Sequence, residues 1–137
     1  MKSGTGGFTI IEVMMVVCIV AMLMVIALPN LVRGRHDAAE AAARETLNQL
    51  TAAMVQYKAA EMPHVYPGDL TALGPKSGGA LGYVNAVLAT GNYQGYRFLL
   101  AANADAFTIR AFPERPGITG TRIFAVTETG QISEVGP

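Results

Sequence analysis

The sequence predicts an α+β protein in which one long N-terminal helix packs against an antiparallel sheet of three or four strands. Three observations support this prediction: a long apolar run near the N-terminus, an amphipathic stretch behind it, and alternating apolar and polar residues in the last third of the chain. Helices repeat their apolar positions about every 3.6 residues and strands every second residue. The 137 residues leave room for one small domain after the apolar run.

The apolar run extends from Phe8 to Leu28 and contains one charged residue, Glu12. A helix that crosses the hydrocarbon core of a bilayer needs about 20 apolar residues, so residues 8–29 are predicted to form a membrane-spanning helix. An acidic residue costs about 2.5–3.5 kcal/mol at the centre of such a helix and less near its ends. Glu12 is therefore predicted to have a function.

Glu12 has no basic residue nearby in the sequence. Lys2 precedes the apolar run, and Arg33 lies about 30 Å away along a helix that rises 1.5 Å per residue. Cleavage between Gly7 and Phe8 would create an α-ammonium group one helical turn before Glu12. The ammonium group of one subunit and Glu12 of its neighbour could then neutralise each other in a packed array.

These residues together resemble the class III signal of type IV pilins and type II secretion pseudopilins. The shared features are a short basic leader, Gly7, Phe8, Glu12 as the fifth residue after the junction, and Pro29. The resemblance implies that residues 1–7 are a leader, that a prepilin peptidase cuts after Gly7, and that Phe8 is N-methylated. It also implies that an inner-membrane assembly machinery moves the subunit from the membrane into a homo-oligomeric helical filament, with Glu12 and Phe8 setting the register.

The function that the resemblance predicts is that of a structural subunit of a type IV pilus-like filament. The chain would lie in the bacterial inner membrane as a precursor and then in an extracellular pilus. Two alternatives within the family are a periplasmic pseudopilin of a type II secretion system and a minor pilin. Major pseudopilins tend to carry a tryptophan-containing calcium segment, and the chain has no tryptophan, which favours the pilus.

Two other interpretations of the apolar run are an ordinary secretory signal peptide and a simple membrane anchor. The apolar core of a signal peptide usually has 7–15 residues and ends in a small-residue cleavage site, whereas this run is longer and carries Glu12.

The second predicted helical segment covers residues 30–62. Pro29 is predicted to break or kink the helix before it, because proline removes one hydrogen bond and clashes with the preceding turn. The segment is amphipathic, and its apolar face is expected to pack on a globular head. That face comprises Leu47, Leu50, Met54 and Tyr57.

The remaining chain is predicted to form the rest of the head. Prolines and a glycine end the helix, and residues 63–95 are predicted to be a variable loop region with a short turn capped by Asp69 and a short helix near residues 84–88. Residues 96–137 are predicted to form the antiparallel sheet. Its hairpin turns are expected at residues 103–105 and 128–130.

No motif for catalysis, phosphate binding or metal binding occurs in the sequence, so we expect no enzyme activity, no cofactor and no metal site. Asn103, Asp105 and Glu128 could offer oxygen atoms to calcium, but turn formation explains them better. The 10 basic and 10 acidic residues are scattered, which gives no support for nucleic-acid binding. The single cysteine, Cys18, allows no intramolecular disulfide. The C-terminal region must therefore be held by packing or by neighbouring subunits.

Overall fold

The computed structural model describes residues 7–76 and 81–136, so residues 1–6 of the predicted leader lie outside the described residues. Its main helix, α1, spans Ile10–Ala60. The chain divides into two compact units, residues 1–34 and residues 35–137.

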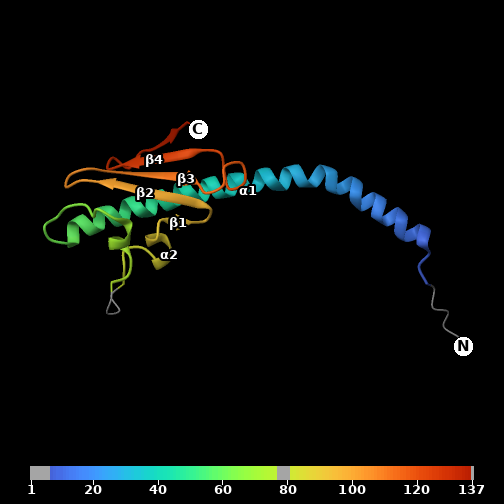
Figure 1. Ribbon diagram of the computed structural model, residues 1–137, viewed down its shortest axis with the longest axis horizontal. Coiled ribbons are helices and arrows are strands. Elements are labelled where there is room, and N and C mark those ends of the chain that lie inside the picture. Colours follow the sequence, from blue (N-terminus) through green and yellow to red (C-terminus); the bar gives the residue numbers. More distant parts are fainter. Residues whose placement is uncertain (1–6, 77–80, 137) are drawn as a thin grey trace, which may run out of the picture. The chain divides into compact units, whose positions relative to one another are not determined.

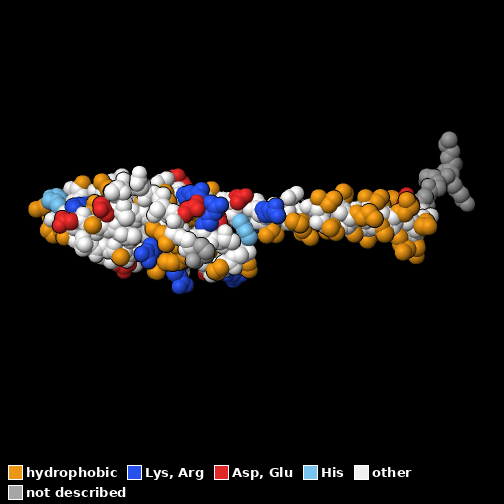
Figure 2. All heavy atoms as spheres, turned by 90° about the horizontal axis from the view of Figure 1, so that it is seen from above, with side chains coloured by type: hydrophobic (Ala, Val, Ile, Leu, Met, Phe, Trp, Pro, Cys, Tyr) orange, Lys and Arg blue, Asp and Glu red, His pale blue; other side chains and the backbone are white. Residues whose placement is uncertain are grey.

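The described part of the N-terminal unit consists mainly of the first half of α1, whose side chains are exposed. All residues from 7 to 35 are exposed, and Figure 2 shows hydrophobic side chains along the visible face of this segment. The segment is long and apolar enough to cross a membrane. An apolar surface of this size needs lipid, or other protein, to cover it.

Of the two effects predicted for Pro29, a break of the helix is wrong. α1 runs through Pro29 without a break, so the predicted boundary between residues 8–29 and residues 30–62 is not a boundary of secondary structure. Proline removes a single N–H group from the helix, and the residues on both sides continue the hydrogen-bonded ladder. The flanking Leu28 and Leu31 favour helix.

The second unit, residues 35–137, is called the head below. The second half of α1 supplies one wall of its core. The predicted apolar face is confirmed, because Leu47, Leu50 and Met54 are fully buried and Tyr57 packs against the core partly buried. The buried residues of the helix are Glu40, Ala43, Thr46, Leu47, Leu50, Ala53 and Met54. One of them, Glu40, carries a charge and therefore requires polar partners.

The other wall is a five-stranded antiparallel sheet with the strand order β1-β2-β3-β4-β5. Figure 1 shows the larger strands lying along α1. The strands are β1 (Asn92–Tyr93), β2 (Tyr96–Ala102), β3 (Phe107–Pro113), β4 (Ile123–Thr127) and β5 (Ile132–Val135). The α+β layout is confirmed, and the prediction of three or four strands is corrected to five.

The additional strand, β1, lies in the segment predicted to be a variable loop. A two-residue turn joins it to β2, and both turn residues, Gln94 and Gly95, have positive φ angles of 49° and 81°. This conformation matches the twist of a two-residue hairpin. Residues 63–95 also contain a 3-10 turn at Leu70–Leu73 and the short helix α2 at Ala86–Ala89, close to the predicted helix at 84–88.

Side-chain caps form at the predicted turns. The Asp69 carboxylate accepts a hydrogen bond from the backbone N–H of Thr71. Asn103 Oδ1 accepts hydrogen bonds from the N–H groups of Asp105 and Ala106, which closes the hairpin between β2 and β3. Gly130 has a φ of 75° in the turn between β4 and β5, a conformation that favours glycine.

Candidate functional site

The structure places two of the predicted site residues, Phe8 and Glu12, beside each other at the start of α1. They line a shallow hollow of about 290 Å³ together with Val13, Val16 and Val17. The Phe8 side chain is 82% exposed. In the described part of the chain no basic side chain forms an ion pair with Glu12. The end of the apolar helix therefore presents an exposed ring and a carboxyl group together.

Glu12 also has a local role in starting the helix. Its N–H lies 3.1 Å from the carbonyl oxygen of Thr9 and 3.3 Å from the Thr9 hydroxyl oxygen. A threonine followed three residues later by glutamate is the pattern of a capping box. A negative charge in the first turn also suits the positive end of the helix dipole. This cap was not predicted, although Thr9 and Glu12 stand at the required spacing in the sequence.

Gly7 and Pro29 lie apart from any cluster of side chains. A Cβ added to Gly7 would meet no atom within 4 Å, so space around this residue would not restrict a larger side chain. Pro29 lies about 25 Å beyond Glu12 along the helix, at 1.5 Å per residue. It does not belong to the group formed by Phe8 and Glu12.

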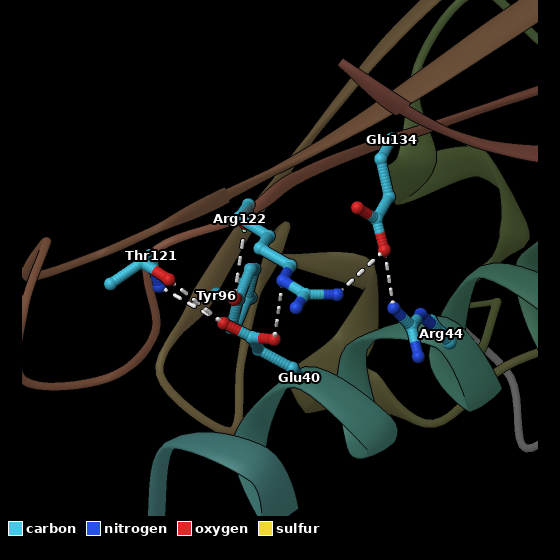
Figure 3. A network of polar contacts seen from close by, with 6 residues as sticks. All are labelled: Glu40, Arg44, Tyr96, Thr121, Arg122 and Glu134. Atoms are coloured by element: carbon cyan, nitrogen blue, oxygen red, sulfur yellow. Dashed lines mark hydrogen bonds and ion pairs between the residues drawn. The ribbon is translucent and has the colours of Figure 1, made fainter. Parts of the chain in front are cut away.

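A second group of polar side chains lies in the head, where α1 meets the sheet (Figure 3). Its centre is Glu40 of α1, which is 8% exposed. One carboxylate oxygen of Glu40 accepts hydrogen bonds from the N–H and the hydroxyl group of Thr121, at 3.1 and 3.3 Å. The other lies 3.5 Å from Nε of Arg122. A buried carboxylate needs such partners, because removing one of them costs about 3–5 kcal/mol.

Arg122 connects this buried carboxylate with a second one at the surface. Its Nη1 lies 2.9 Å from Oε1 of Glu134, and Nη2 of Arg44 lies 2.7 Å from the same oxygen. The guanidinium of Arg44 also lies 4.7 Å from the centre of the Phe124 ring. The hydrogen bond to Glu134 is the main cause of the raised pKa of Arg122. The four charged residues form one continuous ion-pair network, called the clasp below: Glu40, Arg44, Arg122 and Glu134.

Tyr96 of β2 contacts the backbone of Arg122, one of the residues of the clasp. Its hydroxyl group donates a hydrogen bond to the carbonyl oxygen of Arg122 at 3.2 Å. Burial raises the pKa of Tyr96 to about 12, and the negative charge of Glu40 adds to this shift. Tyr96 therefore keeps its proton at neutral pH and remains a donor.

Gly120 makes room for this tyrosine. It has a φ of 151°, and a Cβ at this position would collide with the Tyr96 hydroxyl group. A side chain at residue 120 would displace the ring that positions the Arg122 backbone.

The clasp was missed in the sequence, although two signals for it exist. Glu40 continues the spacing of the buried positions Ala43, Leu47 and Leu50, which places a carboxylate on the apolar face of α1. Glu134 of β5 lies directly opposite Phe124 of β4. Both side chains therefore lie on the face of the sheet that packs on α1. A search for charges at apolar positions would have found both residues.

Metal-binding and reactive groups do not gather in the parts of the chain that the structure describes. No three His, Cys, Asp or Glu side chains among these residues could hold a metal ion together. Cys18 is exposed on the apolar half of α1. The Nδ1–H of His64 donates a hydrogen bond to the carbonyl oxygen of Lys58 at 3.0 Å. The histidine thus caps the end of α1.

Comparisons of the chain with protein-family models, with curated proteins and with solved structures found no match.

Proposed function

We propose that the chain is a structural subunit of a type IV pilin-like filament, cut after Gly7 by a prepilin peptidase and assembled through its N-terminal helix. In this proposal the subunit waits in the bacterial inner membrane and is then moved by an assembly machinery into an extracellular pilus. Copies of the same chain are its main partners. It is not an enzyme and uses no cofactor.

One observation supports this proposal most strongly. The apolar half of α1, in which every side chain is exposed, carries one acid, Glu12, one turn after Phe8, and the two residues line one hollow. The hydrocarbon tails of lipids could cover the apolar surface, but they offer no partner to a carboxylate. A second copy with a free α-ammonium group at Phe8 offers both an apolar surface and an opposite charge.

The head supports the same proposal in a more general way. Residues 35–137 form a compact unit of their own, and all residues of its described core come from this unit. Movement of the helix from lipid into a bundle of helices would leave the buried contacts of the head intact.

Mass spectrometry of sheared extracellular filaments, compared with the cell envelope, tests the proposal. We expect abundant chains that begin at N-methylated Phe8 in the filament fraction. The variant Gly7→Val is expected to stay uncut in the envelope, because a branched side chain at the cleavage junction would block the peptidase.

The other outcomes distinguish the alternatives. Chains that begin at Phe8 but remain in the envelope would favour a pseudopilin or a rare minor subunit. Chains that keep residues 1–7 in every fraction would refute the proposal.

A further inference from the structure

β5 is held to the rest of the head by few contacts. Of its four residues Ile132 is partly buried, and Ser133, Glu134 and Val135 are exposed. It lies at the edge of the sheet, and β4 is the one strand of the described chain that pairs with it. Segments with little buried apolar surface and exposed backbone hydrogen bonds open locally at a lower free energy than the core.

The neighbouring strand β4 is anchored much more firmly. Phe124, Ala125 and Val126 are all buried, and β3 pairs with β4 on the side away from β5. Because β4 is buried and β5 is exposed, local opening of the sheet should occur between these two strands.

Two polar side chains of β5 reach across the boundary between β4 and β5. The Ser133 hydroxyl group donates a hydrogen bond to the carbonyl oxygen of Ala125 in β4, at 3.3 Å, and Glu134 forms ion pairs. One of its oxygen atoms accepts hydrogen bonds from Arg44 of α1 and from Arg122, which directly precedes β4. It therefore connects β5 both to the helix and to the start of the neighbouring strand, as Figure 3 shows.

The clasp has an inner and an outer part with different exposure. Glu40 is buried and bound by Thr121 as well as Arg122, whereas the side chains of Arg44, Arg122 and Glu134 are 43%, 53% and 51% exposed. Salt screens exposed ion pairs much more than buried ones. The outer part can therefore open while the inner part stays closed.

We propose that β5 is a strap that opens separately from the rest of the sheet, and that the contacts of Glu134 with Arg44 and Arg122 are the latch that keeps it closed. This ionic latch fastens the C-terminal strand in a chain that has no second cysteine for a disulfide. The inference concerns residues 35–137 alone and does not depend on filament formation.

Hydrogen–deuterium exchange of the full chain in detergent micelles tests the proposal. Glu134→Gln removes the negative charge of the latch, and we expect the amides of β5 to exchange up to about fivefold faster, the upper limit for an exposed ion pair. The amides of β2 and β3 should exchange at the wild-type rate, because their ladders and the inner part of the clasp remain.

Glu128→Gln is the matched control, because it removes the same charge from the turn between β4 and β5. Glu128 forms no ion pair within the described residues. Its replacement should therefore leave the exchange of β5 unchanged.

Salt gives an independent measurement. Raising the salt concentration from about 0.1 M to about 1 M shortens the screening length from about 10 Å to about 3 Å. Exchange of β5 should become faster in the wild type and in Glu128→Gln, but not in Glu134→Gln.

Two results would overturn the proposal. One is equal exchange of β5 in Glu134→Gln, Glu128→Gln and the wild type. The other is faster exchange of β2, β3 and β5 by the same factor in Glu134→Gln, because this would mean that the head opens as a whole.

Discussion

Two roles explain why residue 12 is a glutamate, and a substitution can distinguish them. One is local: it is the third residue of a helix that begins after Thr9, where a glutamate suits the capping box. The other is the proposed ion pair with the α-ammonium group of a neighbouring subunit. The local role tolerates glutamine as well as glutamate, whereas the ion pair requires the charge.

Glu12→Gln is therefore the informative substitution, and we expect it to abolish filament assembly while cleavage after Gly7 continues. Loss of one partner from a buried ion pair costs about 3–5 kcal/mol, which no retained cap can offset. The yield of sheared filaments and the mass of the mature chain measure the two steps. Wild-type filament yield from Glu12→Gln would show that the cap alone explains Glu12.

At the scale of the elements, the buried face of α1 holds the head together. Leu50 is fully buried, whereas Val55, on the same helix, is 50% exposed. We expect Leu50→Ala to destabilise the head by about 2–5 kcal/mol, because it removes apolar contacts and leaves a cavity.

The matched control is Val55→Ala, which should change the stability by no more than about 0.5 kcal/mol, as is usual at exposed sites. Denaturation of the full chain in detergent, followed by the near-ultraviolet signal of its tyrosines, measures both. Equal effects of the two substitutions would contradict the assignment of the buried face.

Most of the helices, strands and turns could be predicted from the sequence. The long helix, the four larger strands and the turns at Asp69 and Asn103 follow from periodicity and local capping, which depend on near neighbours in the chain. The strand β1 escaped prediction because two residues carry no periodicity. The continuity of α1 through Pro29 also escaped prediction, since a proline costs one hydrogen bond but does not always end a helix.

The two groups of residues described in the candidate site also differ in whether neighbouring residues in the chain bring them together. Phe8 and Glu12 are four residues apart, so their proximity could be read from the sequence. Glu40 and Thr121 are separated by 81 residues, and only the register of the sheet on the helix brings them together. Long-range contacts of this kind do not follow from local pattern.

At the scale of the whole molecule, the apolar half of α1 should decide where the chain is found. We expect the protein to remain with membranes in alkaline carbonate. The double variant Val16→Arg/Val20→Arg should be released, because each arginine costs about 2.5–3.5 kcal/mol inside a membrane helix.

Val87→Arg/Leu99→Arg adds the same charge at exposed positions of the head and should stay with the membrane fraction. Release of the wild-type protein by carbonate would contradict a membrane-spanning role for the helix. Retention of Val16→Arg/Val20→Arg would contradict it as well.

The order of the strands has a consequence for how the head forms. Each strand from β2 to β5 pairs with the one that precedes it in the chain. The helix α1, which supplies the opposite wall of the core, comes before all five strands. Contacts between near neighbours cost little loop-closure entropy and favour rapid folding. During synthesis at about 5–20 residues per second, each new strand meets a surface that is already in place. The sheet can thus grow one hairpin at a time, and no strand has to wait with an open edge for a distant partner.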